Sequence, residues 1–188
     1  MFVYAFFVIG DVMEIKRDTY LIKLIDRMGN QSIKVITGLR RCGKSYLLFH
    51  LFYHYLLEQN IPEDHIIRIA LDDDEHEELL DRKVLSTYIK SLIQDNNTYY
   101  IFLDEVQFVD GFEKVLNGLS RLENLDIYVT GSNSKFLSSD ILTEFRGRGD
   151  EVRVYPLSFS EFVSAYDGSA EEAWYQYVTY GGLPLILT

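Results

Sequence analysis

The stretch Gly38-Leu39-Arg40-Arg41-Cys42-Gly43-Lys44-Ser45 decides the fold of this 188-residue chain. It fits the pattern G-x-x-x-x-G-K-[ST], a glycine-rich loop whose backbone N–H groups surround phosphates. Residues 32–37 before it are rich in β-branched side chains and predict a buried strand. Residues 45–58 after it are largely apolar, lack Gly and Pro, and predict a helix. Strand, glycine loop and helix in this order predict a nucleoside-triphosphate site.

Each kind of residue in this loop has a physical role. Gly38 and Gly43 permit backbone angles that a side chain would forbid, so that successive N–H groups can turn toward an anion. The helix beginning near Lys44 adds free N–H groups and the positive end of its dipole. Lys44 is expected to reach the β- and γ-phosphates, and the Ser45 hydroxyl to bind Mg²⁺. The predicted nucleotide-binding residues are Gly38, Arg40, Arg41, Cys42, Gly43, Lys44, Ser45 and Tyr46.

The apolar run Tyr99–Leu103 is the second informative stretch, because it ends in Asp104-Glu105. A buried strand of this kind, known as a Walker B strand, delivers Asp104 to the sheet edge beside the phosphate loop, where its carboxylate can hold Mg²⁺. Glu105 can orient or deprotonate the attacking water. Such a run is common on its own. Here it follows the phosphate loop after one predicted strand and one predicted helix, which makes it a strong signal.

Two later segments supply further candidates. Thr130–Ser134 follows a short predicted strand, so Ser132 and Asn133 are expected beside the γ-phosphate; a turn with a helix N-cap is the alternative. Arg146 and Arg148, spaced by Gly147, can neutralise charge growing on a transferring phosphoryl group, from the same or a neighbouring subunit. A basic surface loop is the alternative for this pair.

Two other patterns favour structural explanations. His50 and His54 share one side of a helix, but no Glu follows the first His as in H-E-x-x-H, so we interpret them as packed side chains. The acidic run Asp72–Glu75 follows a predicted strand, residues 65–71, and could lie near the nucleotide. A solvated loop is the expected explanation for such a charge run.

The charge of the chain is uneven. Residues 63–81 contribute −8 of the formal net charge of −11. The acidic balance argues against a broad nucleic-acid surface, while the nearly neutral remainder leaves room for a local basic groove. Cys42 is the single cysteine, which excludes an internal disulfide and fits a cytoplasmic protein. We interpret it as a tolerated small residue rather than a redox group.

The chain is expected to have three parts. Residues 1–12 include an apolar stretch too short to cross a membrane and unlike a signal peptide, and we expect them to be an extension before a true start at Met13. Residues 13–155 are expected to form the domain that carries the phosphate loop, beginning with a helix over residues 13–28. Residues 156–188 begin a helical region that continues in a longer protein, with Ser158 or Ser160 as a helix cap. Further predicted elements are helices over 84–94, 112–122 and 170–180, and strands over 126–129 and 151–155.

Taken together, the motifs resemble the N-terminal ATPase domain of an uncharacterised group of bacterial and archaeal AAA-superfamily ATPases. Those motifs are the phosphate loop, Phe102–Gln107, Val129–Ser134, Gly147–Gly149, Pro156–Phe162 and Gly181–Pro184. The resemblance implies an α/β fold of three αβα layers, with a five-stranded, mainly parallel sheet whose Walker B strand is not adjacent to the P-loop strand. It also implies ATP rather than GTP, in agreement with the lack of an N-K-x-D motif. Family members usually continue into a C-terminal helical or winged-helix region and a nuclease-like domain.

These observations lead to a hypothesis of Mg²⁺-dependent ATP binding and hydrolysis coupled to conformational change or assembly. Lys44 would bind phosphates, Ser45 and Asp104 would hold Mg²⁺, and Glu105 would activate water. Asn133 or Ser132 would sense the γ-phosphate, and Arg148 or Arg146 would stabilise the transition state, within a homo-oligomer if the arginine comes from a neighbour. The alternative is a nucleotide-gated module that binds DNA or protein with little hydrolysis. A small-molecule phosphotransferase is weaker, because Glu105 suits water activation. No membrane partner is expected.

Overall fold

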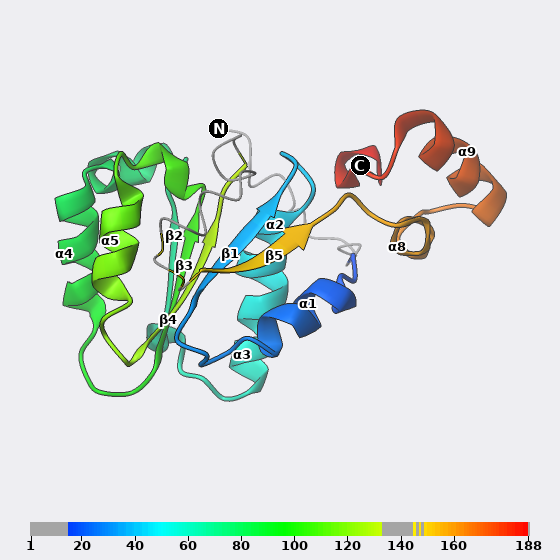
Figure 1. Ribbon diagram of the computed structural model, residues 1–188. Helices are drawn as coiled ribbons and strands as arrows, with labels where there is room; N and C mark the ends of the chain where they lie inside the picture. Colours follow the sequence, from blue (N-terminus) through cyan, green and yellow to red (C-terminus); the bar gives the residue numbers. More distant parts are fainter. Residues whose placement is uncertain (1–14, 133–144, 146, 148, 188) are drawn as a thin grey trace. The chain divides into compact units, whose positions relative to one another are not determined.

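The computed structural model describes residues 15–132, 145, 147 and 149–187 (Figure 1). Contacts divide them into two compact units. The larger unit runs over Asp18–Tyr155, and the smaller one combines residues from Pro156 onward with the N-terminal residues up to Arg17. In the described ranges, no helix combines the length and the apolar character needed to cross a membrane.

The described part of the larger unit contains one five-stranded sheet with the strand order β2-β3-β4-β1-β5. Every pair of neighbouring strands is parallel. β4 lies between β1, which leads into the glycine loop, and β3, the strand predicted to be the Walker B strand. The expected α/β fold with these two strands not adjacent is therefore confirmed. The strands are β1 (Ile33–Gly38), β2 (Ile66–Ala70), β3 (Tyr99–Asp104), β4 (Leu125–Thr130) and β5 (Gly149–Val154).

Helices cover both faces of this sheet, which gives three layers (Figure 1). Alternate residues of a strand point to opposite faces. Ile101 of β3 accordingly packs with residues of α4 and α5 on one face, and Phe102 packs with the helical run 44–58 on the other. The helices are α1 (Asp18–Ile25), α2 (Lys44–Tyr46), a π-helical segment (Leu47–Phe52), α3 (Tyr53–Glu58), α4 (Arg82–Leu92) and α5 (Phe112–Leu119).

A buried ion pair interrupts the apolar interior between β1 and β4. Lys34 is fully buried and pairs with the Asp126 carboxylate. Asp126 also accepts hydrogen bonds from the Tyr128 hydroxyl (3.0 Å) and the Gly29 N–H (3.0 Å). Burial lowers the pKa of Lys34, while Asp126 acts in the opposite direction. Asp126 and Lys34 lie near the starts of their strands. This network therefore links β4 to β1 at the end of the sheet away from the phosphate loop.

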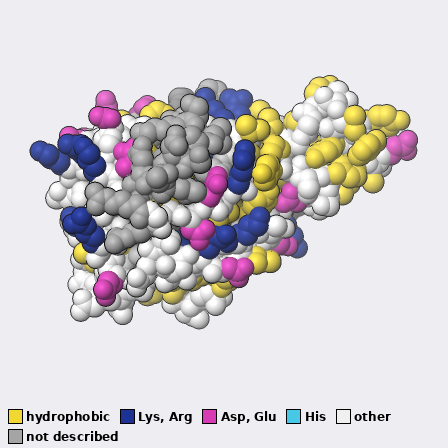
Figure 2. Space-filling model, in the orientation of Figure 1, with side chains coloured by type: hydrophobic (Ala, Val, Ile, Leu, Met, Phe, Trp, Pro, Cys, Tyr) yellow, Lys and Arg dark blue, Asp and Glu magenta, His cyan; other side chains and the backbone are white. Residues whose placement is uncertain are grey.

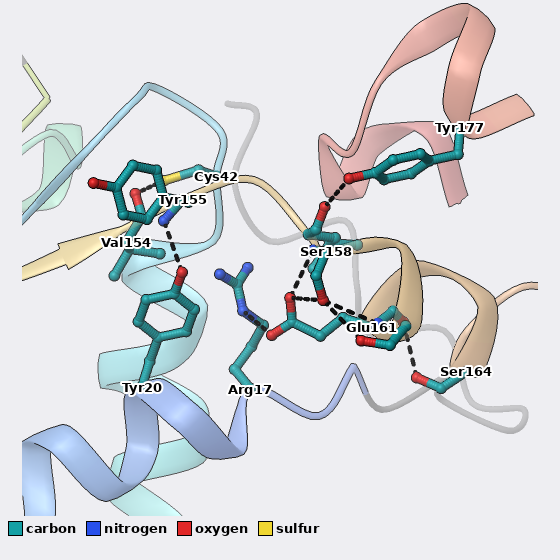
Figure 3. A network of polar contacts seen from close by, with 11 residues as sticks. Arg17, Tyr20, Cys42, Val154, Tyr155, Ser158, Glu161, Ser164 and Tyr177 are labelled. Carbon is teal, nitrogen blue, oxygen red and sulfur yellow. Dashed lines mark hydrogen bonds and ion pairs between the residues drawn. The ribbon is translucent and has the colours of Figure 1, made fainter.

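The first helix is shorter than expected. The sequence predicts a helix over residues 13–28, whereas α1 begins at Asp18, and residues 15–17 are not helical. Ile15 packs instead in the core of the smaller unit, and Arg17 forms an ion pair with Glu161 at 3.1 Å (Figure 3). Tertiary contacts therefore override the helical spacing of the apolar residues here.

The smaller unit contains α8 (Phe159–Ser164) and α9 (Ala170–Tyr180). Each helix begins with a capping box, Ser158 with Glu161 and Ser169 with Glu172, so Ser158 rather than Ser160 is the cap of α8. The buried core of this unit is small and consists of Leu157, Phe162 and Ala173. Hydrophobic side chains remain prominent on its surface (Figure 2), and those of α9 that are more than half exposed are Trp174, Tyr175, Val178 and Tyr180.

Two contacts to Leu157 close the smaller unit. The Leu157 N–H donates to the Gly182 carbonyl (2.6 Å), and the Tyr177 hydroxyl donates to the Leu157 carbonyl (2.9 Å; Figure 3). A Cβ atom at Gly182 would lie 2.2 Å from the Leu157 carbonyl oxygen. Glycine at position 182 is thus required by close approach of two backbone segments.

Candidate functional site

The phosphate loop leaves β1 at a glycine that no other residue can replace without strain. Gly38 has φ 146°, and a Cβ atom there would lie 2.2 Å from the Val154 carbonyl oxygen of β5. Gly43, just before the helix, has φ 92° and ψ 24°. The two motif glycines therefore occupy conformations that L-residues with side chains rarely adopt.

The side chains between these glycines differ in exposure. Leu39, Arg40 and Arg41 are exposed, and Arg41 itself has φ 66°. Cys42 is fully buried, and its Sγ lies 3.6 Å from the Val154 carbonyl oxygen (Figure 3). A thiol packed under the loop in this way fits its interpretation as a small structural residue.

Lys44 begins the helical run after the loop and is only 4% exposed. Its Nζ donates to the carbonyl oxygens of Leu39 (3.0 Å) and Gly38 (3.3 Å). Among the described residues, no carboxylate forms an ion pair with it. A buried cation held by carbonyl groups alone is costly, so an anion placed beside it would be strongly favoured.

Asp104 ends β3 and is brought to Ser45, far away in the sequence. The Thr130 hydroxyl hydrogen bonds to the Asp104 carboxylate, and the Ser45 hydroxyl lies near enough to this carboxylate to lower its pKa. Burial raises the pKa of Asp104 to about 6; the two hydroxyls counteract this rise, and the negative charges of Glu105 and Asp72 add to it. The structure therefore brings together Ser45 and Asp104, the two residues predicted to hold Mg²⁺.

Glu105 turns sharply away from the strand that precedes it. Its backbone is left-handed, with φ 51° and ψ 48°, and its N–H donates to the Thr130 Oγ1 at 3.0 Å. Its carboxylate accepts hydrogen bonds from the Ser132 hydroxyl (2.9 Å) and from the Gln107 side-chain amide. The sequence placed Ser132 at this edge but as a γ-phosphate sensor. It singled out neither Thr130 nor Gln107 as a partner of the two acidic residues, because both contacts depend on local turns that no motif records.

The acidic run and the two histidines can also be placed. Asp72 is exposed at the end of β2 but close enough to Asp104 to raise its pKa, so the run borders the site while remaining solvated. The rings of His50 and His54 pack edge to face with centroids 4.5 Å apart. In the described ranges, no group of three or more His, Cys, Asp or Glu side chains is arranged to hold a metal ion. A Mg²⁺ ion bound with substrate phosphates needs only one or two protein ligands.

Three predicted residues lie outside the described residues: Asn133, Arg146 and Arg148. Their roles as sensor and as transition-state arginines stay predictions. Between the two arginines, Gly147 is described and has φ 76°.

Comparisons with known proteins identify the family and the fold of the chain. An uncharacterized protein of Haemophilus influenzae is 35% identical over 179 residues, which is 92% of this chain and 44% of that protein. The chain spans less than half the length of the curated relatives it matches. The Walker-type ATPase of Pyrococcus abyssi is similar in structure, with a TM-score of 0.64 and 20% identity, over 91% of this chain and 65% of that one.

A second solved structure, the Aeropyrum pernix ORC1 protein in complex with DNA, is similar with a TM-score of 0.53 and 15% identity, over 89% of this chain and 52% of that one. At such identities, both similarities concern the fold. The sequence itself matches the family described as "AAA domain" over residues 30–163, which is most of the chain. The chain therefore belongs to the AAA domain family.

Proposed function

We propose that this chain binds and hydrolyses ATP with Mg²⁺ and couples turnover to a change of conformation or assembly. One observation carries the proposal: the buried Lys44 ammonium has no carboxylate partner among the described residues, and the hydroxyl of the next residue, Ser45, lies beside the Asp104 carboxylate. Cation, hydroxyl and two successive carboxylates thus converge at the carboxyl ends of parallel strands, where open α/β sheets bind ligands.

Each residue then has a distinct task. Lys44 and the loop N–H groups bind the β- and γ-phosphates. Ser45 and Asp104 hold Mg²⁺, which neutralises charge on the phosphates when bound. Glu105 orients the attacking water and accepts its proton. Asp104 must be ionised to bind the metal, so its raised pKa of about 6 favours activity above that pH.

Calorimetric titration with MgATP tests the binding step. The Lys44→Ala variant should show no measurable heat of binding, because the loop loses its cation. The Lys90→Ala variant, which removes an exposed lysine of α4, is the matched control and should bind as the parent chain does. Equal binding by the Lys44→Ala variant would contradict the assignment of the site.

Phosphate release tests the chemical step. The Glu105→Gln variant should bind MgATP normally and lose at least about 99% of turnover, since the amide cannot accept the proton. Unchanged turnover would remove Glu105 from the mechanism while leaving the binding site intact.

A second candidate function is a nucleotide-gated module that binds DNA or protein. It is favoured by the exposure of Arg40 and Arg41 beside the loop and by the fold shared with an ORC1 protein solved in complex with DNA. The turnover rate with and without DNA over a salt series separates the two functions, because phosphate contacts weaken steeply with salt. DNA binding that requires ATP but proceeds without hydrolysis would favour this second function.

A further inference from the structure

Gln107 holds the carboxylate of Glu105 in a way that the sequence motifs do not describe. Its side-chain Nε2 donates to the Glu105 Oε2, and the Ser132 hydroxyl donates to the same oxygen at 2.9 Å. Among the described residues, the other carboxylate oxygen, Oε1, has no hydrogen-bond donor. In the part of the chain that the structure describes, one oxygen of Glu105 therefore receives both hydrogen bonds and the other receives none.

The backbone around Glu105 directs this side chain. The left-handed conformation at Glu105 and its N–H bond to Thr130 fix where the side chain leaves the chain. Val106–Phe108 then forms a single 3₁₀ turn, which carries the Gln107 amide back to the carboxylate two residues earlier. A left-handed glutamate is uncommon, and strained conformations of this kind gather at functional sites.

The Gln107 amide is itself incompletely satisfied. Its Oε1 is buried and has no hydrogen-bond partner among the described residues. Leaving a buried acceptor unpaired opposes stability. The amide nevertheless directs its N–H group to Glu105, because the opposite orientation would place two oxygen acceptors against each other.

We propose that Gln107 is a positioning residue for ATP hydrolysis, which holds Glu105 so that its Oε1 faces the attacking water. This inference rests on the proposed function and adds a residue to it. Within the described ranges, both donors reach Oε2, which leaves Oε1 as the oxygen that can accept a proton from water.

A double-mutant cycle tests the inference through turnover and KM. The Gln107→Leu variant, which keeps the approximate size and removes the donor, should lower kcat about tenfold and leave KM within about twofold. Added to Glu105→Gln, the same change should lower kcat less than twofold, because the carboxylate it positions is already gone. The Gln94→Leu variant, an exposed glutamine just before β3, is the matched control and should leave kcat unchanged.

Several outcomes would overturn the inference. Equal losses of kcat with and without the Glu105 carboxylate would make Gln107 merely structural, and so would a rise of KM at constant kcat. If the Gln107→Leu variant does not fold, the Gln107→Asn variant takes its place, because the shorter amide should also lower kcat without raising KM. If the parent chain hydrolyses no ATP, or Glu105→Gln keeps full turnover, the proposed function fails and the inference with it. If the Glu105→Gln variant loses turnover and the Gln107→Leu variant does not, only the role of Gln107 is refuted.

Discussion

Thr130 and Asp104 hydrogen bond to each other from the ends of neighbouring parallel strands, although they lie 26 residues apart in the sequence. The same Thr130 hydroxyl accepts the Glu105 N–H at 3.0 Å. One fully buried hydroxyl therefore fixes both the carboxylate that we assign to the metal and the backbone of the residue that we assign as base. Fixed geometry of this kind lowers the reorganisation needed during reaction.

The Thr130→Val variant should lower the free energy of unfolding by about 1–3 kcal/mol, because the buried Asp104 carboxylate loses a donor and the part-buried Glu105 N–H loses its acceptor. Urea denaturation followed by circular dichroism measures the change. The Thr130→Ser variant keeps the hydroxyl and should lose less. Parent-like stability in the valine variant would show that these hydrogen bonds contribute nothing net.

Asp104 should make the unliganded chain less stable as the pH rises. Its pKa is raised from 3.8 to about 6, so the folded state binds the proton more tightly than the unfolded state does. The resulting stabilisation is complete below about pH 4 and is lost as the pH rises through about 6. The loss between pH 5 and 8 should be about 1.4 kcal/mol.

The Asp104→Asn variant should remove this part of the pH dependence. Urea denaturation at several pH values should show that its stability relative to the parent chain increases from pH 5 to pH 8. The Asp110→Asn variant changes an exposed aspartate beyond the same strand and serves as control. A stability difference independent of pH would contradict the raised pKa.

Replacing only Lys34 of the Lys34–Asp126 pair should lower the free energy of unfolding strongly. Replacing both residues together should lower it less. The Lys34→Met variant leaves a buried carboxylate unpaired and should lose about 3–5 kcal/mol of stability. The double variant Lys34→Met/Asp126→Asn should recover at least half of that loss, because the asparagine oxygen still accepts from Gly29 and Tyr128. Guanidinium denaturation measures both, with the exposed Lys23→Met as control. A double variant weaker than the single one would show that the pair is favourable overall.

Much of the larger unit could be predicted because its signals are local. The strand–glycine loop–helix pattern identifies β1 and the helical run beginning at Lys44, and the apolar run ending at Asp104 identifies β3. The strand order came from the family resemblance, since periodicity alone does not say which strands are neighbours.

What the sequence missed depends on contacts between distant residues. In the sequence, Lys34 and Asp126 are two charged residues in separate predicted strands, with no sign that they interact. They form a buried ion pair because β1 and β4 are neighbours in the sheet. The helical spacing around Ile15 and Arg17 suggested one long helix, but these residues pack with a segment from the other end of the chain. In the candidate site, Lys44, Ser45, Asp104 and Glu105 were found from motifs, whereas Thr130 and Gln107 emerged only from the geometry.

The smaller unit is discontinuous in sequence, and this has a practical consequence for dissecting the protein. A fragment cut after Tyr155 would keep Ile15 and Arg17 but lose the hydrophobic side chains that cover the first and the Glu161 carboxylate that faces the second. The side chain of Ile15 would then be exposed to solvent at the start of the fragment. This exposed apolar surface would promote aggregation that is unrelated to the proposed nucleotide site. Trimming to Asp18 at the same time removes these residues, so both ends must be cut together for the five-stranded sheet to be studied alone.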